Sequence, residues 1–185
     1  SAGAGAHVAK HGNRSISSDC GSGDLLEALG VEIQCPFGRM MRALKNCGIG
    51  YFHAPLYHPI IKSVHPIRSV LARKKLRTIF NLVGPLTNPL CPRRQAIGVF
   101  AKPMVRVLAE AVKKLKLEHA LIFSSDDHLD ELSTTGKSLV LELAGGVLKT
   151  KSLDAGKFGL KRAARATLRG GSPKANRRIA LRILR

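Results

Sequence analysis

The chain has 185 residues, 44% of them hydrophobic, which is enough for the core of one α/β domain or of one domain and part of another. No apolar run reaches the roughly 18 residues of a membrane span, and the start lacks a signal-peptide pattern, so we expect a soluble, cytoplasmic protein. Its net charge of +19 favours anionic ligands, nucleic acid or an acidic partner. The irregular cysteine spacing suggests neither a zinc-ligand pattern nor a disulfide framework; the cysteines are Cys20, Cys35, Cys47 and Cys91.

A polar loop follows the short apolar run Ala2–Ala9, which is itself compatible with a strand or a helix. The loop consists of Lys10, His11, Gly12, Asn13, Arg14, Ser15, Ile16, Ser17 and Ser18. Leu25, Leu26 and Leu29 then predict a helix. A basic, glycine-containing loop before a helix can hold phosphate, because free N–H groups and the positive end of the helix dipole converge there. A solvated connection is the alternative.

Two short helices are predicted next. Asp24 and Glu27 have the spacing of a capping box, and Gly30 is placed to end a helix of about six residues. Pro36 lies in the first turn of a second, amphipathic helix that ends at Gly48. The methionines of this helix are expected in the core; they are Met40 and Met41.

The following segment predicts a buried strand and a longer helix. The strand is Tyr51–His53, and the helix opens at Tyr57–Pro59. Its apolar positions follow the helical period; they are Ile60, Val64, Ile67 and Leu71. Arg68 lies at the edge of this stripe, where a guanidinium is either exposed or able to grip a carboxylate.

The middle of the chain predicts a rigid turn and then a βαβ unit. Residues 78–89 contain two X-Pro turns with side-chain amides, which suits a pocket wall or a domain junction. Residues 95–100 predict a strand, 104–115 an amphipathic helix, and 120–123 a buried strand of the parallel type.

Four of the twelve acidic residues follow this second strand; they are Asp126, Asp127, Asp130 and Glu131. Open α/β sheets bind ligands at the carboxyl ends of their strands, and carboxylate oxygens suit Mg²⁺. Acids on a surface loop are the alternative. His128 is expected to be a loop residue rather than a metal ligand, because imidazole suits Mg²⁺ poorly.

The last third predicts a β-hairpin from 138–143 and 147–153 and, finally, a helix. From Lys161 to Arg185 there are nine basic residues and no acid, which fits a solvated helical tail or an electrostatic contact with nucleic acid.

With these residues in view, the sequence resembles the anthranilate phosphoribosyltransferases, whose catalytic fold is shared with pyrimidine nucleoside phosphorylases. The resemblance runs through residues 10–18, Leu26-Glu-Ala-Leu-Gly30, Ala54-Pro with Tyr57-His-Pro59, Arg77-Thr-Ile-Phe-Asn-Leu-Val-Gly-Pro-Leu-Thr-Asn-Pro89, Leu129-Asp-Glu-Leu-Ser133 and Gly170-Gly-Ser-Pro173. It implies an α/β catalytic domain over 1–185, with a central, mostly parallel sheet flanked by helices and incomplete at both ends.

The resemblance also implies a function in tryptophan biosynthesis: transfer of the 5-phosphoribosyl group from phosphoribosyl pyrophosphate to anthranilate, with release of pyrophosphate. Residues 10–18 and Ser22 would border phosphoribosyl pyrophosphate, Asn13 and Arg68 would contact anthranilate, and His58 would lie near the acceptor. The metal cofactor would be Mg²⁺, held by Asp130 and Glu131. No nucleophile or general base is nominated.

Departures from the family temper these expectations. The helical domain that usually forms the homodimer interface and the Gly-Thr-Gly-Gly-Asp loop are absent from these residues, so we expect weak or no activity from them alone. Asp19 stands where the family commonly has lysine, Ala175 replaces a commonly acidic residue, and about three extra residues lie around 72–74. A diverged, non-catalytic relative that binds nucleic acid is the alternative.

Overall fold

The computed structural model describes residues 1–15, 18–74, 76 and 78–184. Contacts divide the chain into two compact units. The first unit comprises Ser1–Cys91 and Gly170–Arg185, and the second comprises Pro92–Arg169. Within the described residues, no helix is both long and apolar enough to span a membrane.

The first unit is built on a two-stranded parallel sheet. β1 (Val8–Gly12) runs beside β2 (Ile49–His53). The start of the expected loop, residues 10–12, therefore belongs to a strand. The predicted burial of β2 is confirmed, because its last four residues are buried. Phe52 and Tyr51 pack with Met40, and Met41 packs against this cluster, so both methionines contribute to the core as predicted.

Helices surround this small sheet. The first two are α1 (Ser22–Ala28) and α2 (Phe37–Cys47); Pro36 is the N-cap of α2 rather than a residue of its first turn, and Gly48 ends α2 as predicted. The longer helix expected from 57 onward is instead two short ones, which begin at Pro59 and His65, because Pro66 has no backbone N–H with which to continue the first of them. The remaining elements of the unit are η1 (Ala2–Ala4), α3 (Ala54–Tyr57), α4 (Pro59–Ser63), α5 (His65–Arg73), α6 (Phe80–Val83), η2 (Gly84–Thr87) and α8 (Pro173–Leu184).

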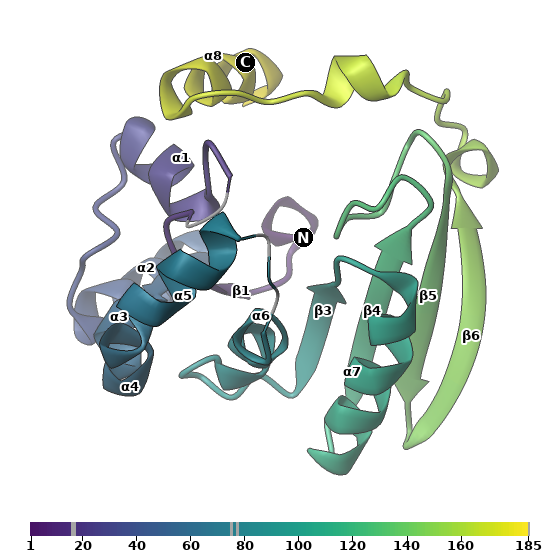
Figure 1. The fold of residues 1–185 in the computed structure, drawn as a ribbon, viewed down its shortest axis with the longest axis horizontal. Coiled ribbons are helices and arrows are strands. Elements are labelled where there is room, and N and C mark those ends of the chain that lie inside the picture. The colour runs from purple at the N-terminus through teal and green to yellow at the C-terminus, as the bar shows by residue number, and fades with distance from the viewer. Residues whose placement is uncertain (16–17, 75, 77, 185) are drawn as a thin grey trace. The chain divides into compact units, whose positions relative to one another are not determined.

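The second unit contains the predicted βαβ arrangement. β3 (Arg94–Gly98) is parallel to β4 (His119–Ser125), and α7 (Lys102–Lys114) connects them. Figure 1 shows α7 lying along one face of the sheet. The buried side of α7 supplies Val105, Leu108, Ala109 and Val112. Because β3 and β4 are parallel, both end at the same edge of the sheet.

The predicted hairpin completes this four-stranded sheet. β5 (Lys137–Ala144) pairs antiparallel with β4 and with β6 (Val147–Asp154). Gly145 and Gly146 have φ of 55° and 77°, as a tight two-residue hairpin turn requires. The short 3-10 helices η3 (Ala155–Phe158) and η4 (Arg165–Leu168) follow. The α/β class is confirmed, with the strands divided between two sheets and the hairpin adding antiparallel pairs to the larger one.

Candidate functional site

The loop between β1 and α1 is anchored by one carboxylate. Asp24 accepts hydrogen bonds from the backbone N–H groups of Ser15 and Gly21, both at 2.8 Å. Burial alone would raise the pKa of Asp24, but these hydrogen bonds outweigh it and lower the pKa. Gly21 is therefore the N-cap and Asp24 the third helical residue, so the predicted capping box of Asp24 with Glu27 is wrong by one turn. The predicted helix end is confirmed, because Gly30 has a φ of 90°.

Glycines allow this loop to lie directly on the start of α1. A Cβ on Gly21 would lie 2.6 Å from the Ser15 nitrogen. A Cβ on Gly23 would lie 3.0 Å from the Tyr51 hydroxyl and 3.1 Å from the Arg14 nitrogen. Neither glycine has a positive φ, so close packing rather than backbone conformation is what requires glycine here.

Two polar side chains of the loop have local partners. The Arg14 guanidinium donates to both carboxylate oxygens of Glu27, at 2.8 and 2.6 Å, and lowers the pKa of Glu27. The Asn13 side-chain oxygen accepts from the Arg14 nitrogen at 2.8 Å. The Asn13 amide nitrogen takes no part in this contact, so it can donate to a ligand.

The serines and the lysine of the loop differ in their surroundings. The hydroxyls of Ser15 and Ser18 lie 2.6 Å apart, and Ser15 also accepts from the Ser18 nitrogen at 2.8 Å. Lys10 is exposed on β1, and Ser22 starts α1 beside Gly12. Ser17 and Ile16 lie outside the described residues.

Two predicted site histidines from distant parts of the chain meet. The Nε2 atoms of His11 and His58 are 3.2 Å apart, and the rings pack edge to face. The other ring nitrogen of His11 lies 3.2 Å from the Gly84 carbonyl oxygen. Burial lowers the pKa of His11, an effect that the Gly84 carbonyl partly offsets. The neutral ring therefore links β1 to the Gly-Pro turn, and the Asn88 side chain adds a hydrogen bond of 3.0 Å to the Ala9 carbonyl.

Arg68 is a half-buried cation on α5. Its guanidinium carbon lies 5.5 Å from the centre of the Phe80 ring, in cation–π geometry. Burial lowers the pKa of Arg68. Among residues 1–15, 18–74, 76 and 78–184, no carboxylate pairs with it. A half-buried guanidinium that has no carboxylate partner among these residues is suited to bind a planar anion such as a carboxylate.

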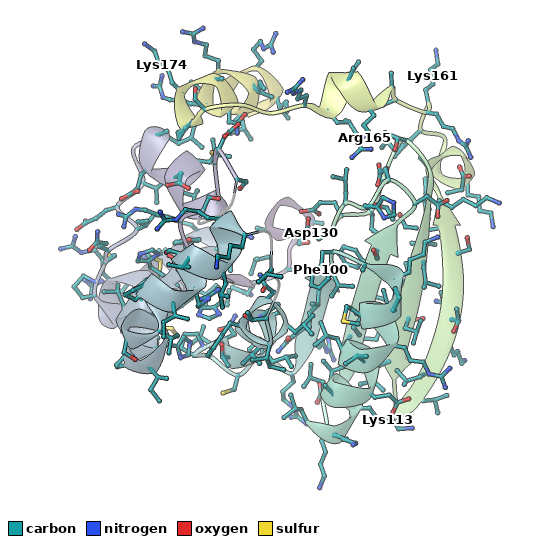
Figure 2. The ribbon with its side chains drawn as sticks, viewed as in Figure 1. Phe100, Lys113, Asp130, Lys161, Arg165 and Lys174 are labelled. Atoms are coloured by element: carbon teal, nitrogen blue, oxygen red, sulfur yellow. The ribbon has the colours of Figure 1, made fainter. Side chains whose placement is uncertain are left out.

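The loop from β4 to β5 contains four acids in different surroundings. Asp126 pairs with Lys102, and Asp127 accepts from hydroxyls of its own loop. Asp130 and Glu131 are exposed, and Figure 2 shows Asp130 at the edge of the sheet where β3 and β4 end. Two adjacent carboxylates offer the hard oxygen donors that suit Mg²⁺, which also takes water and phosphate oxygens. In the described part of the chain, no group of three or more acidic, histidine or cysteine side chains forms a complete metal site.

Several structurally important residues were not identified from the sequence. Asp24 anchors the first loop although its capping role was assigned differently, and Asn88 joins its turn to β1. The sequence also gives no separate role to Asp127 or to Gly98. Two features of the sequence could have indicated them: Gly98 lies at the end of a predicted strand, and Ser125 and Ser133 flank the loop that contains Asp127.

The basic end of the chain is exposed. On α8 the exposed basic residues are Lys174, Arg177, Arg178 and Arg182, the first of which is labelled in Figure 2. Within the described ranges, none of them pairs with a carboxylate. Contact with nucleic acid stays a prediction.

Comparison with known proteins shows the family. The model of the glycosyl transferase family, a/b domain, matches residues 1–185. The chain belongs to this family. The resemblance noted in the sequence is also confirmed, because its curated relatives are named anthranilate phosphoribosyltransferase.

Two of these relatives of the chain come from Rubrobacter xylanophilus and Methanosarcina acetivorans. That of Rubrobacter xylanophilus is 43% identical over 182 residues, which cover 98% of this chain and 52% of the relative. That of Methanosarcina acetivorans is 41% identical and is covered for 49% of its length. The chain therefore spans about half the length of the curated relatives it matches.

Solved structures agree with this placement in the glycosyl transferase family. The anthranilate phosphoribosyltransferase of Thermus thermophilus matches with a TM-score of 0.85 and 39% identity, over 99% of this chain and 53% of that one. The Saccharomyces cerevisiae enzyme, solved in complex with PRPP and Mg, matches with a TM-score of 0.80 and 27% identity, over 92% of this chain and 46% of that one.

Proposed function

We propose that this chain is the α/β part of an anthranilate phosphoribosyltransferase acting in tryptophan biosynthesis. The reaction transfers the 5-phosphoribosyl group of phosphoribosyl pyrophosphate to the amino nitrogen of anthranilate and releases pyrophosphate. The observation that carries the proposal is Arg68, a half-buried cation beside Phe80 without a carboxylate partner among the described residues. Anthranilate supplies both the carboxylate and the aromatic ring that this pair of side chains would bind.

The first unit supplies the substrate-binding groups of this proposal. Residues 10–18 and Ser22 would border phosphoribosyl pyrophosphate. Asn13 and Arg68 would hold anthranilate, and His58 would line the approach of the acceptor. The burial of His11 keeps its ring neutral, which suits an acceptor that attacks as a free amine.

Little acid–base chemistry is required of these residues. Positive charge develops at the ribose C1 atom while pyrophosphate leaves, so cationic groups and orientation of the amine supply most of the rate enhancement. The proposal accordingly assigns no nucleophile and no general base.

Asp130 and Glu131 would hold Mg²⁺. Support comes from their hard oxygen donors and from the yeast relative, whose structure contains PRPP and Mg. When bound, Mg²⁺ would neutralise charge that accumulates on the leaving pyrophosphate. The two side chains are exposed, so a metal ion can reach them from solvent.

Isothermal titration calorimetry tests the proposal. Anthranilate is titrated into the chain in the presence of Mg²⁺ and phosphoribosyl pyrophosphate, and Arg68→Lys is expected to weaken its binding at least about tenfold, because lysine lacks the planar fork. Arg39→Lys is the control, since Arg39 forms an exposed ion pair with Glu32. The proposal is wrong if phosphoribosyl pyrophosphate does not bind the unmodified chain, or if both variants bind anthranilate equally.

A further inference from the structure

The loop between β4 and β5, residues 126–136, contains two acids to which the proposed function gives no role. Asp126 is exposed and forms an ion pair with Lys102. Asp127 is less exposed, and among the described residues its hydrogen bonds come from its own loop and the end of β4. The different surroundings of these neighbouring carboxylates show that Asp127 has a structural task inside the loop.

Asp127 joins the two ends of the loop. One of its oxygens accepts from the hydroxyl of Ser125, the last residue of β4. The other accepts from the hydroxyls of Ser133, at 2.5 Å, and Thr135. These donors come before and after the segment that contains Asp130. The Asp127 carboxylate therefore bridges the two sides of that segment, while Asp126 accepts a hydrogen bond of 3.3 Å from the Lys137 nitrogen at the base of the loop.

Backbone bonds complete the closure. The Ser125 nitrogen donates to the Leu129 carbonyl oxygen at 3.2 Å, and the Ser125 hydroxyl oxygen lies 2.9 Å from the same carbonyl oxygen, so its single proton is shared between Leu129 and Asp127. On the other side, the Ser133 nitrogen donates to the Ser138 hydroxyl at 3.0 Å. Ser125, Ser133 and Ser138 are each no more than 8% exposed, whereas Asp130 is exposed. The closed loop thus presents residues 130–132 outward from a buried polar base.

Gly98 supports the same segment from the neighbouring strand. A Cβ on Gly98 would overlap the carbonyl oxygen of Asp130, so the backbone of Asp130 occupies the space that a side chain would fill. Gly98 has no positive φ, and its backbone conformation alone would therefore tolerate alanine. The close approach to Asp130 is what requires glycine at the end of β3.

We propose that Asp127 and Gly98 are positioning residues that fix the Asp130–Glu131 segment for metal binding. The inference rests on the proposed function, in which these two carboxylates hold Mg²⁺. Mg²⁺ demands near-ideal octahedral geometry, so a small displacement of a ligand weakens its binding. Neither Asp127 nor Gly98 touches the metal in this arrangement; each acts through the backbone that carries the ligands.

Mn²⁺ binding measured by electron paramagnetic resonance on the full 185-residue chain tests the inference. Asp127→Asn and Gly98→Ala are each expected to raise the Kd for Mn²⁺ by about tenfold, the lower end of the usual effect of residues that support ligands. Asp126→Asn is the control for lost charge, and Gly38→Ala, whose added Cβ would meet no atom within 4 Å, is the control for a glycine substitution. Both controls are expected to change the Kd less than about twofold.

A second variant separates positioning from charge and from misfolding. The double substitution Ser133→Ala with Thr135→Val removes two donors to Asp127 and leaves every charge in place, and it should weaken Mn²⁺ binding as Asp127→Asn does. Hydrogen exchange of residues 128–132 should become faster in both variants, while exchange in α7 should not change. Faster exchange throughout the second unit would reveal general unfolding and contradict a local positioning role.

The outcomes distinguish this inference from the proposed function. If Asp130→Asn weakens Mn²⁺ binding and Asp127→Asn does not, the positioning role is wrong and the metal site stands. If Asp126→Asn weakens it as much as Asp127→Asn, charge alone explains the effect and the inference is overturned. If Asp130→Asn has no effect on Mn²⁺ binding, the metal assignment in the proposed function is wrong, and the positioning role that depends on it is wrong as well.

Discussion

His128 holds a backbone conformation that disfavours a side chain, with a φ of 62° in the loop between β4 and β5. A residue with a Cβ pays about 1 kcal/mol to adopt the left-handed region. Glycine avoids this cost, but it loses more conformational entropy on folding, which offsets part of the gain. His128→Gly is therefore expected to raise the free energy of unfolding by about 0.5 kcal/mol, measured by urea denaturation. His128→Ala keeps the Cβ and should give no gain. Equal gains in both variants would assign the effect to the imidazole.

The ionised carboxylate of Asp127 stabilises the fold in a pH-dependent way. Burial alone would raise the pKa of Asp127, but hydrogen bonds from Ser125, Ser133 and Thr135 outweigh it and hold the pKa far below the usual range. The stabilisation is therefore complete above the unfolded pKa of about 3.9 and is lost as the pH falls toward the folded pKa.

Asp127→Asn tests this dependence. At pH 7 the substitution is expected to lower the free energy of unfolding by about 1–2 kcal/mol, because an ionised acceptor of several hydroxyl donors is lost. Urea denaturation at pH 7, 5, 4 and 3 should show the difference from the unmodified chain shrinking below pH of about 4. A difference that stays constant down to pH 3 would contradict a role for the charge.

At the scale of elements, the start of α1 depends on Asp24. Asp24→Ala would leave the N–H groups of Ser15 and Gly21 without their acceptor, and Gly21 has no side chain to replace it. We expect a loss of about 1–2 kcal/mol in the free energy of unfolding, measured by thermal or urea denaturation. Glu32→Ala, which breaks only an exposed ion pair with Arg39, should cost less than about 0.5 kcal/mol. Equal losses would mean that Asp24 is an ordinary surface acid.

The elements that could be predicted from the sequence are those specified by local pattern. The helix α7, the strand β4 and the hairpin of β5 and β6 each follow from apolar periodicity or from paired glycines. The end of α1 follows from Gly30 in the same way. The start of α1 could not be predicted in this way. Its N-cap, Gly21, has no side chain that would mark it, and Asp24 is acceptable both as an N-cap and as the third residue of the helix. The pattern of apolar residues after 57 likewise predicted a single helix where two exist, because Pro66 interrupts it.

The candidate site depends on contacts that no local pattern contains. His11 meets His58 across 47 positions, and the Asn88 side chain bonds to Ala9 across 79. The approach of Gly98 to Asp130 is also set by strand pairing. The resemblance to known enzymes identified residues near substrates, but the residues that hold them in place became visible only when the chain was folded.

At the scale of the whole molecule, charge is the dominant feature. A net charge of +19 on 185 residues destabilises the compact state by self-repulsion, and most of the ion pairs described join exposed side chains, which stabilise little. Salt shortens the range of this repulsion from about 10 Å at 0.1 M to about 3 Å at 1 M. Added salt should therefore stabilise the fold.

Thermal unfolding in NaCl measures the effect. Raising NaCl from 0.1 M to 1 M should increase Tm by about 2–4 °C, the shift that about 1 kcal/mol produces in a chain of this size. The double variant Arg177→Glu with Arg178→Glu reverses two exposed charges on α8 and should reduce this increase, because less repulsion remains to be screened. Arg177→Lys with Arg178→Lys keeps the charge and should leave the salt response unchanged. An identical response in all three proteins would attribute the stabilisation to the general effect of salt on apolar burial rather than to the net charge.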